Sequence, residues 1–139
     1  LVVRSKFAEA EKKCLSTLEL IGCKFPRSDF LQTLSLIKGV LKAKKLVTEK
    51  TEEDIRNLPD LNDPDKKFGL LVMETLIAAA MGTGSKMTAL PMLRQFEWIF
   101  EYGICSQSNV VFAGIGLVLT AIMGELKLGQ KASHFGQIV

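Results

Sequence analysis

Three residues of this chain could support acid–base or metal chemistry: Glu97, Glu101 and His134. Carboxylates four residues apart lie on one side of a helix, where they could transfer protons or bind a metal ion. No histidine lies near this pair in the sequence, so we expect a solvated helix face beside Arg94. His134 lacks an evident nucleophile or orienting acid, and we expect it on the surface, or partly packed, in the last helix.

The cysteines Cys14, Cys23 and Cys105 have no CxxC spacing, and with a single histidine they do not suggest a structural zinc site. An odd, sparse set of cysteines in a chain rich in Lys and Glu is typical of reduced thiols in the cytosol. We therefore expect a cytoplasmic protein whose cysteines behave as small apolar residues. No catalytic, cofactor-binding or metal-binding residue is assigned, and no cofactor is expected.

The stretch AAMGTGSKMT, residues 79–88, contains the ingredients of a phosphate-binding loop. Such a loop needs GxxxxGK[ST] between a strand and a helix. Here Ser85 separates Gly84 from Lys86, and Ala79 stands where the upstream glycine is required. The preceding segment is predicted to be helical. We expect a turn between two helices in which Ser85 caps the second helix, with no nucleotide site.

Two further groups of side chains have a binding and a structural interpretation. Lys38, Lys42 and Lys45 form a basic stripe that could meet an acidic partner, although a solvated helix face is the default. Three aromatic residues close in sequence are expected to pack in the core or against a neighbouring hairpin and do not form an RNA-binding platform. They are Trp98, Phe100 and Tyr102.

The 139 residues are enough for one domain with a core, and 47% of them are apolar. The net charge is only +3, which does not indicate nucleic acid. Of the 33 charged residues, 25 precede Phe68, so the second half is expected to be the more buried. Its apolar run, Val110–Met123, is about fourteen residues long and falls short of the roughly 20 that span a bilayer. We expect no membrane partner.

Helical periodicity dominates the chain, and no segment alternates convincingly as a strand would. One helix is expected before Gly22, and a second after an N-cap at Ser28 or Asp29. Thr51-Glu52-Glu53-Asp54 predicts a capping box on a short helix to Asn57, and Asp63-Pro64 predicts the start of a helix that ends near Gly82. The last three helices are expected around Phe96, over Ser108–Met123 and from Lys127 to the end.

These helices carry apolar residues at helical spacing. The apolar sets are Phe7, Cys14, Leu18 and Ile21; Phe30, Leu34, Ile37 and Leu41; Phe68, Leu71, Val72, Thr75 and Ala79; and Met92, Phe96, Ile99 and Gly103. Small residues at Gly116, Thr120 and Gly124 predict close approach of a neighbouring helix. The predicted fold is all-α, with antiparallel hairpins over about 4–47, 51–82, 86–104 and 108–139 in a TPR-like α-solenoid segment.

Several motifs resemble one helical region that follows the AAA/STAND-type ATPase module in large multidomain signalling kinases. They are CLSTLELIG (residues 14–22) followed by Phe25-Pro26, DIRNLPDLNDP (54–64), and Tyr102-Gly103 with Ser108, Gly124, Leu128-Gly129 and Phe135-Gly136. The similarity extends in the same order over roughly residues 10–139. It departs at Leu61, where the family has Met, and at Glu125-Leu126, where it has Asp-Tyr.

This resemblance implies a non-catalytic superhelical arm that holds the ATPase and couples the binding of protein partners to an output domain. The glycines of the last hairpin also resemble the small residues of a TPR repeat. No family catalytic residue falls on this sequence. Because the chain begins at Leu1 and ends on apolar residues, we expect a segment of a longer protein. Two alternatives stay open: a small enzyme using Glu97, Glu101 and His134, and a bundle that binds an apolar ligand among Phe96, Phe112 and Leu117.

Overall fold

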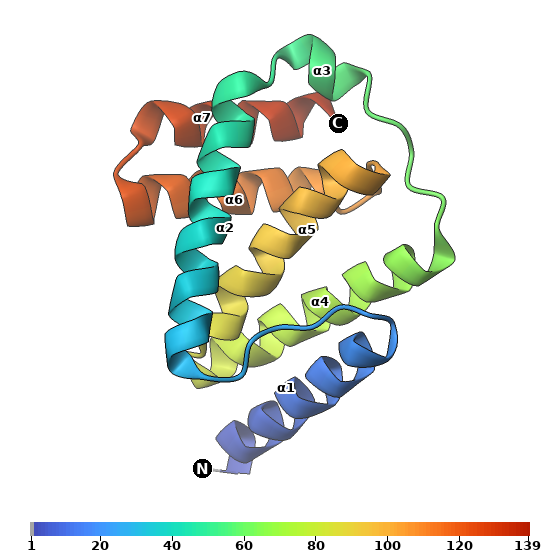
Figure 1. Cartoon of the computed structure of the whole chain (residues 1–139), viewed down its shortest axis with the longest axis vertical. Helices are drawn as coiled ribbons and strands as arrows, with labels where there is room; N and C mark the ends of the chain where they lie inside the picture. Colours follow the sequence, from blue (N-terminus) through green and yellow to red (C-terminus); the bar gives the residue numbers. More distant parts are fainter. Residues whose placement is uncertain (1) are drawn as a thin grey trace. The chain divides into compact units, whose positions relative to one another are not determined.

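The computed structural model describes residues 2–139, and it is built of helices (Figure 1). The elements are α1 (Val2–Leu20), α2 (Asp29–Glu49), α3 (Glu52–Arg56), α4 (Pro64–Thr83), the 3-10 helix η1 (Lys86–Thr88), α5 (Ala89–Tyr102), α6 (Ser108–Met123) and α7 (Leu126–Ile138). No β-strand occurs within residues 2–139, where Asp60 and Ile104 form an isolated bridge. The prediction of an all-α chain is confirmed.

Helices α2, α3 and α4 begin where their capping residues predict. The Leu31 amide donates to Ser28 Oγ at 3.2 Å, so Ser28 caps α2. Thr51 and Asp54 form the reciprocal capping box of α3. The Asp63 carboxylate accepts from the first amides of α4, and Pro64 occupies the first turn, where its missing N–H leaves no partner unsatisfied.

The chain divides into two compact units, the first made of residues up to Leu36 and of Asp63–Met92. In this unit α1 packs along α4 (Figure 1). Phe7, near the start of α1, lies against Gly82, near the end of α4, so the two helices are antiparallel. A Cβ added to Gly82 would lie 2.7 Å from Cε2 of Phe7, which explains why this position suits glycine. The core includes Cys14, Leu18, Met73, Leu76 and Ala80.

The second unit contains residues Ile37–Asn62 and Leu93–Val139. Its core is a set of fully buried phenylalanines, one each from α5, α6 and α7. The rings of Phe96 and Phe112 meet edge to face with centroids 5.5 Å apart, and those of Phe112 and Phe135 do so at 6.2 Å. Edge-to-face contacts favour this arrangement beyond the area that they bury.

Helices α6 and α7 approach closely because small residues line their contact. A Cβ on Gly116 would lie 2.6 Å from the carbonyl oxygen of Gly129, and a Cβ on Gly129 would lie 2.7 Å from that of Gly116. Thr120 also contacts Gly129. The predicted close approach at Gly116 and Thr120 is therefore confirmed. Gly124 does not take part in it, because it ends α6 in the left-handed conformation with φ 65°.

The link after α3 pairs with the segment after α5. The Ile104 amide donates to the Pro59 carbonyl at 2.8 Å, and the Leu61 amide donates to the Ile104 carbonyl at 2.8 Å. Gly103 has φ 121° and its Cα faces the link so closely that a Cβ would lie 2.5 Å from the Pro59 oxygen. Two of the motifs that carry the family resemblance, LPDL and YG, thus form one structural unit.

The apolar stripe on α2 faces outward, although such a stripe normally marks the buried side of a helix. Phe30, Leu34, Ile37 and Leu41 are exposed, whereas Val40, Ala43 and Val47 are buried. The buried side of α2 includes Gly39, where a Cβ would lie 2.9 Å from Cδ1 of Leu93 on α5. Small residues permit this close packing, and a hydrophobicity pattern gives them little weight.

The predicted apolar set on α4 is displaced in a similar way. Phe68 and Leu71 are exposed to 49% and 52%, whereas Leu70, Met73 and Leu76 on the adjacent side of the helix are buried. Apolar residues occur on several sides of α4, so the periodicity alone did not identify the packed face.

Candidate functional site

The glycine stretch forms a turn between helices, as predicted. Helix α4 ends at Gly84 in the left-handed conformation, and Ser85 caps η1 by accepting from the Met87 amide. The carboxylate of Glu11 on α1 accepts from Ser85 Oγ at 2.8 Å and from Thr83 Oγ1 at 3.2 Å. An anion thus already occupies the hydroxyl groups of this turn, and it would repel a phosphate group.

The lysine of the same turn is also engaged. Lys86 Nζ lies 3.8 Å from Oδ1 of Asp29 at the start of α2. Asp29 is almost fully exposed, so this ion pair contributes little to stability. The turn joins α1, α4 and the beginning of α2 within the first unit, which is a structural role.

The carboxylates of Glu97 and Glu101 share a basic partner. Lys42 Nζ lies 3.6 Å from Glu97 Oε2 and 3.9 Å from Glu101 Oε1. Two carboxylates beside one ammonium group form a cluster on the partly exposed surface of α2 and α5, in which the lysine neutralises only part of the negative charge. One lysine of the predicted stripe, Lys42, therefore pairs with carboxylates of the same chain.

His134 pairs with a different carboxylate, that of Glu52. Its Nε2 lies 2.6 Å from Glu52 Oε1, which links α7 to the start of α3. Both side chains are about half exposed. The prediction that His134 is a partly packed surface residue of the last helix is confirmed.

The aromatic residues of α5 are structural, as predicted. Trp98 is buried, and its ring meets that of Tyr102 edge to face at 5.9 Å. Phe100 contacts both Phe96 and Phe112. Leu117 is 69% exposed, so it does not share an interior with the phenylalanines that we considered for an apolar ligand site.

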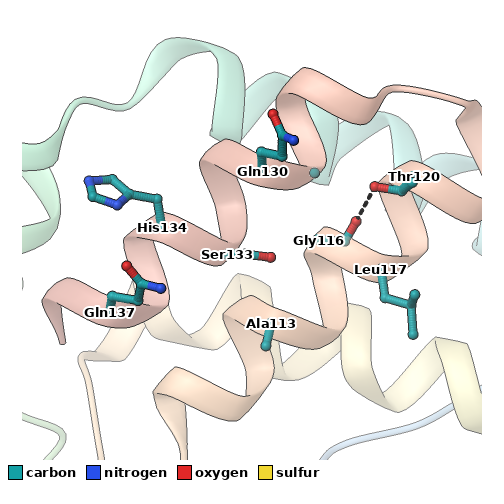
Figure 2. A pocket seen from close by; sticks show the side chains of 9 residues that line it. Ala113, Gly116, Leu117, Thr120, Gln130, Ser133, His134 and Gln137 are labelled. Carbon is teal, nitrogen blue, oxygen red and sulfur yellow. Dashed lines mark hydrogen bonds between the residues drawn. The ribbon is translucent and has the colours of Figure 1, made fainter.

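A shallow groove of about 510 Å³ runs along the outside of α6 and α7 (Figure 2). Ala113 and Leu117 form its apolar side, and Gln130, Ser133 and Gln137 form its polar side. The remaining lining residues are Gly116, Thr120, Gly129 and His134. Thr120 donates to the Gly116 carbonyl at 2.9 Å within α6 (Figure 2). Ser133 and His134 both line the groove, but Figure 2 shows their side chains pointing in different directions.

The outer face of α2 is the feature that sequence analysis did not identify as a candidate site. We call it the α2 ridge, and it comprises Phe30, Leu34, Ile37 and Leu41, with side chains exposed to 73%, 41%, 51% and 53%. Leu31 beside it is exposed to 51%. Large apolar side chains gathered on one exposed face are typical of surfaces that a protein, a membrane or another ligand covers. The apolar stripe was the available signal, but nothing in the sequence shows that it faces outward.

Two titratable groups respond to their surroundings. Burial, helped by the negative charge of Glu11, raises the pKa of the Cys14 thiol, which keeps the thiol protonated and weakly reactive. Hydrogen bonds from the backbone and side chain of Thr51 lower the pKa of Asp54. Both shifts have structural causes.

Among residues 2–139, no group of three or more His, Cys, Asp or Glu side chains is placed to hold a metal ion. In the same part of the chain, no helix combines the length and the apolar character needed to cross a membrane. Within the described residues, Cys14 and Cys105 form no disulfide bond.

Comparison with known proteins adds no relative. A scan against protein-family models and searches of curated proteins and of solved structures found no match to this chain.

Proposed function

We propose that this chain is a non-catalytic helical scaffold that binds protein partners within a larger signalling protein. The observation that carries the proposal is the α2 ridge, because it places four large apolar side chains at the surface of one helix. Exposing such a row to water is unfavourable by about 25 cal/mol per Å² of apolar surface, and a partner that covers it removes this cost.

The α6–α7 hairpin supports a scaffold with TPR-like repeats. Gly116 and Gly129 bring the two helices into close contact. A Cβ added to Gly136 would lie 3.0 Å from Cβ of Phe112. Small residues between paired helices are what a stacked helical-hairpin protein requires. The paired LPDL and YG motifs further support the proposed relation to the helical region of multidomain signalling kinases.

In this proposal the chain couples the binding of a partner to a neighbouring output domain of the same protein. The coding sequence on either side of these residues tests it. We expect an AAA/STAND-type ATPase module upstream of Leu1 and an output domain downstream of Val139. A reading frame that encodes neither module contradicts the proposal.

A further inference from the structure

The α2 ridge has the spacing of a coiled-coil seam. Its residues are separated by four, three and four positions, which is the alternation of a and d positions in a heptad. At 1.5 Å per residue the ridge extends over about 16 Å of a single continuous helix. A second helix laid along α2 could therefore insert its own apolar side chains between those of the ridge.

One edge of the ridge is basic. Lys38 follows Ile37 by one residue, and Lys45 follows Leu41 by four. Both lysines therefore have the same heptad position. Both are exposed, and neither forms an ion pair with another residue of the described chain. By contrast, Lys42 is paired with Glu97 and Glu101. The segment from Phe30 to Thr48 contains no Asp or Glu, so α2 itself supplies no counter-charge along the ridge.

A second copy of the chain would not satisfy these lysines. In an antiparallel pair of α2 helices, like heptad positions meet, so lysine would face lysine. In a parallel pair the lysines would lie beside the heptad positions of Thr33 and of the buried Val40, and neither residue carries a charge. Either arrangement leaves the basic edge without a carboxylate, and like charges placed together oppose association.

From this complementarity we infer that the α2 ridge binds an amphipathic helix of a protein partner that carries Asp or Glu beside its apolar seam. This inference rests on the proposed function, since it names the partner of the same scaffold. The apolar seam provides most of the affinity, and the carboxylates opposite Lys38 and Lys45 provide orientation and selectivity.

The test uses the intact 139-residue chain and two designed helical peptides, both with leucine at the a and d positions. One peptide carries Glu along the edge that faces the lysines, and the other carries Lys at the same positions. Fluorescence anisotropy of labelled peptide at low salt measures both dissociation constants. We expect the Glu peptide to bind at least about tenfold more tightly than the Lys peptide, because opposite charges replace like charges at the rim.

Variants locate the binding site. Leu34→Asp should weaken binding of the Glu peptide by about thirtyfold or more, because it places a charge in the apolar seam. Leu117→Asp on α6 is the matched control, since Leu117 is also exposed, and it should change binding less than twofold. The double variant Lys38→Glu/Lys45→Glu alters only exposed residues, so it should fold, and it should reverse the preference toward the Lys peptide.

Equal binding of the two peptides, or binding of neither, would overturn the inference. So would an effect of Leu117→Asp as large as that of Leu34→Asp. Two other occupants would also overturn it: a second copy, seen as a dimer that Leu34→Asp dissociates, or a membrane, seen as Leu34-dependent binding to phosphatidylserine vesicles in place of peptide. None of these results bears on the modules encoded upstream and downstream. Failure of this inference is therefore distinguishable from failure of the proposed function.

Discussion

Replacing Gly129 by alanine should destabilise the α6–α7 hairpin, although alanine is the better helix former. The added Cβ would lie 2.7 Å from the carbonyl oxygen of Gly116 and in contact with Thr120 Oγ1. Ordinary van der Waals contact begins at 3.4 Å, so the backbones must separate by about 0.7 Å. The side chain of Thr120 can rotate away, but the carbonyl of Gly116 moves only with α6.

The expected magnitude is a difference of two effects. Overpacking of a close contact costs about 1–3 kcal/mol. Replacing a helical glycine by alanine gains about 0.5–1 kcal/mol. From the middle of both ranges we expect the free energy of unfolding to fall by about 1 kcal/mol, which lowers the urea midpoint by roughly 0.5 M for a typical small protein.

The fluorescence of Trp98 provides the assay. It is the single tryptophan of the chain, and it is buried in α5 within the same unit as the hairpin. Ala113→Gly, on the exposed side of α6, is the matched control because it measures the cost of glycine in this hairpin without a steric clash. If Gly129→Ala raises the urea midpoint while Ala113→Gly lowers it, the close contact does not constrain the two helices.

Three other changes have definite expected outcomes. Gly103→Ala should lower the free energy of unfolding by about 2 kcal/mol or more, because it places a side chain at φ 121° against a backbone carbonyl, and an unchanged thermal midpoint would contradict this. Cys14 should react with iodoacetamide at least about tenfold more slowly than the partly exposed Cys105 in the folded chain, and mass spectrometry of timed samples showing equal rates would refute the assigned burial. Asp54→Ala should lower the thermal midpoint at neutral pH. A carboxyl group with a depressed pKa stabilises the fold above its unfolded pKa and loses this effect as the pH falls through its folded pKa, so the difference from wild type should shrink in acid, and a constant difference would contradict the capping role.

The helix boundaries could be predicted from the sequence because they depend on neighbouring residues. Thr51 and Asp54 cap α3 through contacts three residues apart. Asp63 and Pro64 start α4, and Gly84 ends it, for equally local reasons. The all-α class follows from the same signals.

The packed faces of α2 and α4 could not be predicted in the same way, because they depend on which helix lies opposite. On α2 the buried side is set by Gly39 against Leu93, a contact between residues far apart in the sequence. Periodicity identified the stripe that contains Leu34 and Ile37, but it did not show that this stripe faces outward.

For the candidate residues too, local features could be predicted from the sequence, whereas contacts between helices could not. The turn around Ser85 was predicted from the missing phosphate-loop spacing, yet its bond to Glu11 on another helix was not. The shared ion pair of Glu97 and Glu101 with Lys42 likewise depends on tertiary packing. Pairing of charges between helices leaves no periodic trace in a single sequence.

The position of the bound peptide is the most direct test of the proposed binding of a partner helix to the outer face of α2. Titrating the ¹⁵N-labelled chain with the Glu peptide and recording amide chemical shifts identifies that position. We expect the largest changes within Asp29–Glu49. Changes concentrated on α6 and α7, with α2 unaffected, would contradict it.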